Sequence, residues 1–325
     1  ADLIDNSVEA GATAINIQVG WSADGNLMLS IADNGSGMNY EELKEAMRYG
    51  AVGKDEQHRL GKYGLGLKTA STGFCKCLKL ASTRGNGAAL KTAEWDLDVV
   101  AEQGSWLYRF DDASPEVSDE FADHHEVLER LSGADADHGS LVTWEKIDRL
   151  LLKQHGEPYK NPGSALDRKR DSLKNHLRLV FHRFLDQGDT RARNITIAVD
   201  GEPLVPWDPF LHRWGVGEMV KEATIELRNS GGEIENVRLR CVIYPHPNDV
   251  TDRTYRSEVD FSVNTQGIYV YRENRIIEGP TWLNYTREPH LNRLRVELDY
   301  TAPLDPLFQV DVKKKDLRID QGVMD

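Results

Sequence analysis

Asn6 stands in an amphipathic helical pattern that is already under way at the first residue, in the stretch ADLIDNSVEA. Residues three or four apart lie on one face of a helix, so Asp2, Asn6 and Glu9 share a stripe. The buried side is expected to consist of Leu3, Ile4 and Val8. An Asn side-chain oxygen can ligate a hard cation such as Mg²⁺, and a carboxylate one turn earlier can orient or deprotonate a water. Taken alone, the segment is more simply explained as a charged helix face with one Asn.

The stretch DNGSGM directly follows a predicted strand. Asp33 ends that strand, and Gly35 and Gly37 allow a tight turn that brings the backbone close to a ligand. A buried Asp at this position can accept a hydrogen bond from an amino group. An ordinary Asp-Asn-Gly turn explains the same residues when they are taken alone.

A third stretch, RLGKYGLGLKTAS, is rich in glycine. Gly61, Gly64 and Gly66 precede the residues LKTAS, which can open a helix. Backbone N–H groups in a glycine turn and at a helix start form an anion site that suits phosphates. The stretch has no Walker motif, and no parallel βαβ unit opens here, so a dinucleotide-binding fold fits badly.

These residues are carried by alternating strands and helices. The hydrophobic pattern predicts strands over 13–19, 25–35, 77–83, 90–97 and 139–148. Residues 39–50 predict a short helix with Asn39 as its N-cap. The acidic segment 111–138 predicts a helix inside a surface insertion.

The composition changes at 153–167, a polar stretch with Pro and Gly that is typical of a linker. A helix is predicted over 170–186. Hairpins follow, with turns at Asp200-Gly201, Gly231-Gly232 and Glu273-Asn274. We therefore expect an α+β fold in two domains, residues 1–152 and 166–325.

The formal net charge of −13 argues against a protein whose whole surface binds nucleic acid. Local basic clusters at 167–183 and 310–319 leave room for a basic channel, although solvated helix faces explain them as well. No apolar run is long enough to span a membrane, and three cysteines are too few for a disulfide framework. A reducing cytoplasm is the expected location.

The three motifs, in this order, closely resemble those of the GHKL ATPases, which include the DNA gyrase B subunit, the ninety-kilodalton heat-shock chaperone, sensor histidine kinases and MutL. The resemblance covers roughly residues 1–150. A fourth element, GSLVTW, resembles the family's Gly-Thr strand, with Ser140 where Thr is usual. The resemblance implies a Bergerat-type α/β sandwich that binds ATP with Mg²⁺.

The resemblance also implies roles for single residues. Asn6 would hold Mg²⁺ against the triphosphate, with Glu9 behind it. Asp33 would accept a hydrogen bond from the adenine amino group, beside Gly35, Gly37 and Met38. The remaining implied nucleotide contacts are Gly61, Gly64 and Gly66 at the phosphates, Ser140 through water, and Lys54 in a lid spanning 39–60.

The second half resembles the transducer domain of MutL and MORC ATPases, a smaller α+β fold akin to a domain of ribosomal protein S five. The stretch KKDLRI fits a MutL pattern whose lysine reaches the γ-phosphate. The resemblance thus assigns this role to Lys314, although a basic strand end explains the stretch too. Such a lysine would couple nucleotide state to a movement between domains.

One departure concerns the general base, which in the family is a Glu four residues before the Asn. Asp2 occupies that position with a side chain one methylene shorter, so we expect slow hydrolysis. The resemblance implies a homodimer and DNA-linked work such as repair, chromatin or defence, with DNA and an unknown protein as possible partners. A chaperone-like ATPase and a non-hydrolysing, nucleotide-dependent interaction module stay open. Because family members carry a strand before the Asn helix, the natural protein is expected to start earlier.

Overall fold

The computed structural model describes residues 1–22, 24–48, 66–105, 107–135, 137–153, 155–262, 264–282 and 286–308. Contacts divide the chain into two units. Unit 1 takes the described residues within 1–54, 63–178 and 193–205, and unit 2 takes those within 179–192 and 206–308. The division into an ATP-binding domain at 1–152 and a transducer-like domain at 166–325 stays a prediction.

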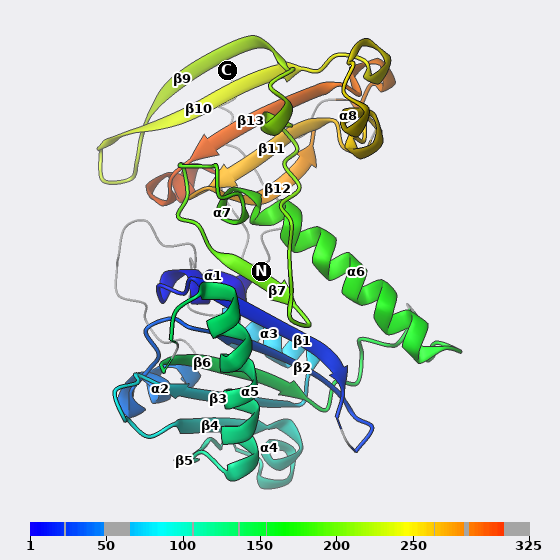
Figure 1. Cartoon of the computed structure of the whole chain (residues 1–325). Helices are drawn as coiled ribbons and strands as arrows, with labels where there is room; N and C mark the ends of the chain where they lie inside the picture. The colour runs from blue at the N-terminus through cyan, green and yellow to red at the C-terminus, as the bar shows by residue number, and fades with distance from the viewer. Residues whose placement is uncertain are drawn as a thin grey trace. The chain divides into compact units, whose positions relative to one another are not determined.

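Unit 1 contains a mixed sheet of eight strands among the described residues, in the order β5-β4-β3-β6-β2-β1-β7-β8 (Figure 1). The strands are β1 (Ala14–Trp21), β2 (Leu27–Asp33), β3 (Cys77–Thr83), β4 (Lys91–Asp96), β5 (Arg109–Asp112), β6 (Gly139–Glu145), β7 (Thr196–Val199) and β8 (Glu202–Pro203). The five strands predicted in the first half are confirmed as β1, β2, β3, β4 and β6. Neighbours pair antiparallel except β1 and β7, which pair in parallel.

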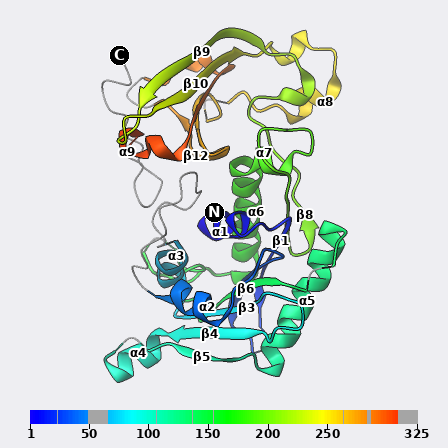
Figure 2. The same cartoon turned by 90° about the vertical axis from the view of Figure 1, so that its left-hand side faces the viewer.

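Helices lie on both faces of this sheet. They are α1 (Asp2–Glu9), α2 (Tyr40–Met47), α3 (Gly66–Phe74), α4 (Leu97–Gln103) and α5 (Pro115–Ser132). Figure 2 shows α2 and α3 on one face and α5 on the other. Side chains along β2 point alternately to the two faces of the sheet. The Ser30 side chain contacts His124 of α5, and the Asp33 side chain on the other face contacts Ser7 of α1. Each face of the strand therefore packs against a different helix.

The expectation of a surface insertion over 111–138 is wrong, because α5 is a covering layer of the sheet. Its residues Phe121 and Leu128 are buried in an apolar cluster with Ala32 of β2 and Leu141 of β6. The helix begins at the N-cap Ser114, whose hydroxyl accepts from the Val117 N–H, and ends at a left-handed glycine. Two buried histidines on the packed face hid the apolar stripe from the sequence pattern.

The helix predicted over 170–186 begins earlier and is interrupted. It forms α6 (Pro162–Val180) and α7 (His182–Leu185), which are separated at Phe181. The predicted apolar stripe is buried at Leu177, Val180, Phe181 and Phe184. None of the helices in the described ranges has the length and apolar character needed to cross a membrane.

Unit 2 contains a five-stranded sheet among its described residues, in the order β12-β11-β13-β10-β9. Its strands are β9 (Glu218–Arg228), β10 (Ile234–Ile243), β11 (Gly267–Arg272), β12 (Arg275–Thr281) and β13 (Leu294–Tyr300). Short helices complete it: η1 (His212–Trp214), η2 (Pro247–Asp249), α8 (Arg253–Glu258), η3 (Pro289–Leu291), η4 (Ala302–Leu304) and α9 (Asp305–Phe308). The α+β fold expected for the chain is confirmed.

The predicted hairpin turns are confirmed. Asp200 and Gly201 have φ of 54° and 77°, and Glu273 and Asn274 have φ of 49° and 67°. Two successive positive φ angles are typical of the type I′ turn, whose twist matches that of the flanking strands. The glycine turn joins β9 to β10 as predicted, with φ of 85° at Gly232.

Candidate functional site

Asp33 lies at the end of β2, in a setting that fixes both of its carboxylate oxygens. Its side chain accepts a hydrogen bond from the Ser7 hydroxyl at Oδ2 (2.8 Å) and from the Gly35 N–H at Oδ1 (2.9 Å). The residue is 7% exposed. Burial raises the pKa of Asp33, and the hydrogen bonds from Gly35 and Ser7 oppose that rise. The Ser140 N–H is a third donor to this carboxylate, whose two oxygens together can accept about four hydrogen bonds, so capacity for one more remains.

Helix α1 carries Asn6 next to Ser7, the residue that donates to this carboxylate. The apolar residues predicted for its buried side are confirmed, since Leu3, Ile4 and Val8 are 7%, 1% and 6% exposed. Asn6 is exposed, and Asp2 is half-buried one turn earlier. Because Ser7 follows Asn6 directly and binds Asp33, the first two sequence motifs meet through one hydrogen bond.

The turn after Asp33 requires its two glycines for steric reasons. A Cβ on Gly35 would lie 2.8 Å from the Ala10 side chain, at the end of α1. Gly37 has φ of +61°, and a Cβ there would lie 1.8 Å from the Thr83 carbonyl oxygen. No side chain fits at such a distance from backbone, so the turn lies directly against α1 and β3. The Ser36 N–H donates to the Ala10 carbonyl at 2.8 Å and holds this approach.

Ser140 lies opposite Asp33 in the β2–β6 register and belongs to a small hydroxyl network. The Ser82 hydroxyl donates to the Gly139 carbonyl at 2.9 Å and accepts from the Met38 N–H at 2.8 Å. Because its one proton is used, the 2.9 Å contact between the two serine hydroxyls has Ser140 as donor. Ser140 and Met38 are thus brought together beside Asp33 by Ser82.

The glycine-rich stretch reaches the described residues at Gly66, where α3 begins as predicted. Helix α3 packs near α1 and is tied to β6 by Trp144, whose indole N–H donates to the Ser71 hydroxyl at 2.8 Å. The third motif therefore ends in a helix beside the one that bears Asn6. The predicted phosphate contacts Gly61, Gly64 and Lys54, and the predicted γ-phosphate ligand Lys314, lie outside the described residues.

The predicted helix within the lid region is α2, which spans Tyr40–Met47. Asn39 is its N-cap as predicted. Its side chain accepts from the Glu42 N–H, and the Glu42 carboxylate accepts from the Asn39 N–H in return. Residues 49–60 of the predicted lid lie outside the described part of the chain.

Sequence reasoning missed four residues that hold the site together. Ser7 and Ser82 position Asp33 and Ser140 through the hydrogen bonds given for each. The Asn34 side chain accepts from the Thr13 and Ala14 N–H groups, both at 2.9 Å, and so ties the turn to β1. His138 contacts the Gly35 carbonyl through Nδ1 at 2.6 Å. Only Ser7, adjacent to Asn6 on the buried side of a helix, left a signal in the sequence.

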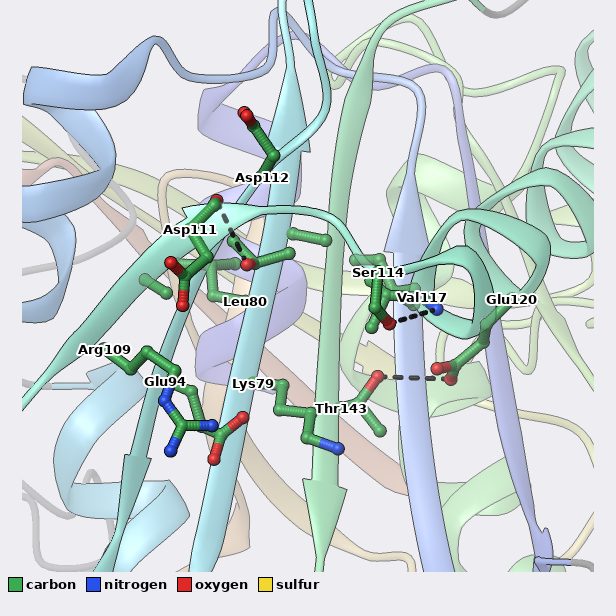
Figure 3. A pocket seen from close by; sticks show the side chains of 14 residues that line it. Lys79, Leu80, Glu94, Arg109, Asp111, Asp112, Ser114, Val117, Glu120 and Thr143 are labelled. Atoms are coloured by element: carbon green, nitrogen blue, oxygen red, sulfur yellow. Dashed lines mark hydrogen bonds between the residues drawn. The ribbon is translucent and has the colours of Figure 1, made fainter.

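A cavity of about 210 Å³ lies on the opposite face of the sheet. Figure 3 shows Glu120 of α5 pointing to Thr143 of β6, and Arg109 near Glu94 on the neighbouring strands. Lys79 and Thr143 alternate with Leu78 and Trp144, so they face α5 while Ser82 and Ser140 face α1. This cavity is therefore separate from the surroundings of Asp33.

The match to a protein family covers the residues around Asp33. Residues 1–132 match the family model described as "Histidine kinase-, DNA gyrase B-, and HSP90-like ATPase". Those residues contain Asn6, Asp33 and the two glycines of the turn that packs against α1 and β3. Over residues 1–132, the chain therefore matches the GHKL superfamily of ATPases.

Curated proteins that are similar to this chain include MORC proteins. It is 26% identical over 179 residues to ATPase MORC2B of Mus musculus, which is 49% of this chain and 18% of the relative. It is 38% identical over 76 residues to Protein MICRORCHIDIA 4 of Arabidopsis thaliana, which is 22% of this chain and 10% of that protein. The matched parts are thus less than a fifth of either relative's length.

A solved structure shares the fold of this chain over almost its whole length. That structure, "Crystal Structure of N terminal domain of a DNA repair protein", matches with a TM-score of 0.51 at 14% identity. The match covers 99% of this chain and 88% of the other. At this identity the likeness concerns the fold alone.

Proposed function

We propose that the chain binds Mg·ATP through α1, the turn after Asp33, and α3, and hydrolyses it slowly. The observation that carries the proposal is the Ser7–Asp33 hydrogen bond of 2.8 Å. It places an acceptor for an amino group next to the helix that exposes Asn6. A charged helix face or an ordinary turn requires no buried contact between the two motifs.

Asp33 suits the adenine amino group because its carboxylate can accept one more hydrogen bond beside those from Ser7, Gly35 and Ser140. The glycines at 35 and 37 leave backbone, without side chains, beside that carboxylate. Ser140 would act through water from the adjacent strand, and Met38 would pack on the base. The buried Asp33 would then select a donor at this position, since an unpaired buried acceptor is costly.

Asn6 would supply the protein ligand for Mg²⁺. This cation is usually bound by one or two protein groups together with substrate phosphates, so a single exposed Asn suffices. The bound cation neutralises charge on the phosphates. The glycines at 61, 64 and 66, and Lys54, would donate to the phosphate oxygens.

Asp2 would orient or deprotonate the attacking water from one turn before Asn6. Its side chain is a methylene shorter than that of Glu, and a base has to lie within roughly 3 Å of its proton donor. Slow turnover follows from this shorter reach. Lys314 would contact the γ-phosphate, so ATP binding would be coupled to lid closure, to movement of the second unit and to formation of a homodimer.

We further propose DNA-linked work in repair, chromatin or defence; the names of the similar proteins support the ATPase and the repair parts of this proposal. One is called an ATPase of the MORC group, and one solved structure is that of a DNA repair protein. A DNA-binding assay at increasing salt tests this part, because binding through phosphates weakens steeply with salt. Absence of salt-sensitive binding would leave an ATPase acting on protein clients.

The first experiment measures ATP binding by calorimetry for the wild type and Asp33→Asn. We expect the variant to lose at least tenfold in affinity, because an amide presents only one acceptor oxygen. Asp24→Asn, at an exposed turn in the same unit, is the matched control and should bind normally. Unchanged affinity in Asp33→Asn would refute the site.

The second experiment measures steady-state phosphate release for the wild type and Asn6→Ala. We expect hydrolysis to fall to background in Asn6→Ala and to persist in Asn26→Ala, which changes an exposed Asn between β1 and β2. If the wild type binds ATP but releases no phosphate, the chain is a nucleotide-dependent interaction module rather than an enzyme.

A further inference from the structure

Strand β9 forms one edge of the sheet in unit 2 and is exposed along nearly its whole length. Among the described residues, it pairs only with β10. Only Ala223 and Leu227 of its eleven residues are half-buried, and the rest are exposed. Ile225 is 37% exposed and Val220 is 56% exposed. An exposed edge of this kind is a template for pairing with another strand.

The backbone groups that face outward can be identified from the hairpin. The Asn229 N–H donates to the Glu233 carbonyl at 2.9 Å, which makes these two residues a hydrogen-bonded pair. Hydrogen-bonded and non-hydrogen-bonded pairs alternate in an antiparallel ladder. Leu227, Ile225 and Ala223 therefore bond to β10. The N–H and C=O groups of Glu222, Thr224, Glu226 and Arg228 point away from β10.

The stretch available for pairing is limited at one end. A bulge interrupts the β9–β10 register between Cys241 and Val242, opposite Lys221 and Met219. Bulges and lysines are the devices that commonly protect an edge strand. The seven residues Glu222–Arg228 contain neither, nor a proline, and their ladder is regular.

We propose that Glu222–Arg228 pairs antiparallel with the same residues of a second copy of this chain, with the two-fold axis at Ile225. In this register, Glu222 lies opposite Arg228 of the second copy, and Ala223 lies opposite Leu227. Ile225 lies opposite its own copy. The interaction is independent of the proposed nucleotide site and joins two five-stranded sheets into one.

The side chains favour this register over its neighbours. In an antiparallel pair, two residues that lie opposite each other share a face of the sheet. Either both or neither of them point their backbone N–H and C=O groups toward the other strand. The two-fold axis must therefore pass through a residue position rather than between two residues. An axis at Thr224 would place Glu222 opposite Glu226 of the second copy, which is a repulsive pair. An axis at Ala223 would place Lys221 opposite Ile225 and would extend across the bulge.

The proposed register places charge and apolar surface where the sheet already has them. The Glu222 carboxylate lies 3.8 Å from the Arg240 guanidinium, on the charged face of the sheet. Leu227 packs on the opposite face, against the cluster that contains Val237. A pair of Ile225 side chains would extend that apolar face. Seven residues per copy are fewer than the roughly 20–30 per partner of standard stable interfaces, so we expect a weak, concentration-dependent dimer.

The first test measures the mass of the full chain by sedimentation, without nucleotide, over increasing concentration. The wild type should shift toward a dimer. Thr224→Pro removes an outward N–H that β10 does not use, so it should remain monomeric while the melting temperature stays near that of the wild type. Thr224→Val keeps the N–H and a β-branched side chain, and should dimerise. A wild type that stays monomeric, or a dimeric Thr224→Pro, overturns the proposal.

The second test identifies the register by exchanging charges. Glu222→Arg and Arg228→Glu should each reduce self-association, because each places like charges opposite one another in its homodimer. A mixture of the two variants should associate again, since each new charge then meets its opposite. Circular dichroism confirms that both variants are folded. A mixture that associates no better than either variant alone rules out the axis at Ile225.

Discussion

The Ser7–Asp33 contact yields a quantitative prediction, because both residues are almost fully buried. Ser7 is 4% exposed and Asp33 is 7% exposed, and their oxygens lie 2.8 Å apart. Removal of one partner of a buried hydrogen bond costs about 1–3 kcal/mol. The Gly35 N–H still donates to the other oxygen of Asp33, so the loss should lie in the middle of this range. Ser7→Ala should therefore lower the free energy of unfolding by about 2 kcal/mol at pH 7.5.

The pairing can be isolated by a double-mutant cycle in urea, followed by tryptophan fluorescence, without nucleotide. In Asp33→Asn, the Ser7 hydroxyl can accept from the new amide and turn to the Leu3 carbonyl, 3.3 Å away. Ser7→Ala should therefore cost less than about 1 kcal/mol in that background. Ser36→Ala, in the exposed part of the same turn, should be nearly neutral. Additive losses within about 0.5 kcal/mol would contradict a direct Ser7–Asp33 coupling.

The pH dependence of the same variant provides a further check. Burial already raises the pKa of Asp33, and the loss of Ser7 would raise it more, because the charged form loses a donor. A raised carboxyl pKa contributes stability that is present below the unfolded pKa of about 3.9 and lost as the pH rises. The deficit of Ser7→Ala should therefore shrink as the pH falls toward that value. A deficit that grows on acidification would refute the assignment.

Three further predictions concern unit 1. Gly37 has φ of +61°, and a Cβ there would lie 1.8 Å from the Thr83 carbonyl oxygen, so Gly37→Ala should abolish ATP binding and lower the melting temperature in calorimetry. The control Gly20→Ala, which has open space around its Cβ, should keep a melting temperature near that of the wild type. Gly73→Ala, in α3 and also in open space, should raise the unfolding free energy in urea by about 0.5–1 kcal/mol. Burial lowers the pKa of His124 to about 4. The neutral ring therefore stabilises the fold above about pH 6.5, and the free energy of unfolding should fall by about 3 kcal/mol as the pH drops to 4. Urea unfolding of His124→Gln should show a flatter pH profile than that of the wild type.

The tautomer of His124 explains why its charged form is excluded. The Asn16 amide nitrogen can only donate, so His124 Nδ1 accepts at 3.1 Å, and Nε2–H is left to donate to the Ser30 hydroxyl at 2.8 Å. Protonation at Nδ1 would make the new N–H face the Asn16 N–H, so that two donors would lie against each other in a fully buried site. A wild-type stability that is flat between pH 6.5 and 4 would contradict this arrangement.

The sequence predicted the features that depend on neighbouring residues. The Asn39 N-cap, the start of α3 at Gly66 and the turn at Glu273-Asn274 follow from local backbone and side-chain rules. The buried side of α1 follows from helical periodicity. The family resemblance depended on the same kind of signal, because its motifs are short stretches in a fixed order.

Long-range features were beyond such rules. The parallel pairing of β7 with β1 joins residues that are far apart in the sequence. The sequence pattern indicated strands at both positions but carried no information about which strands would be neighbours. Helix α5 was misjudged because His124 and His125 interrupt its apolar face, although hydrogen bonds and packing bury both rings.

The sequence by itself determined which residues can do chemistry: Asn6 on a helix, Asp33 at a strand end, and glycines that let backbone approach a ligand. Only the tertiary structure decided that Ser7 holds the Asp33 carboxylate and that Ser82 joins Ser140 to Met38. The physical reason is the range of the interactions. Helix and turn preferences act over a few residues, whereas a hydrogen bond between side chains depends on where the whole sheet places them.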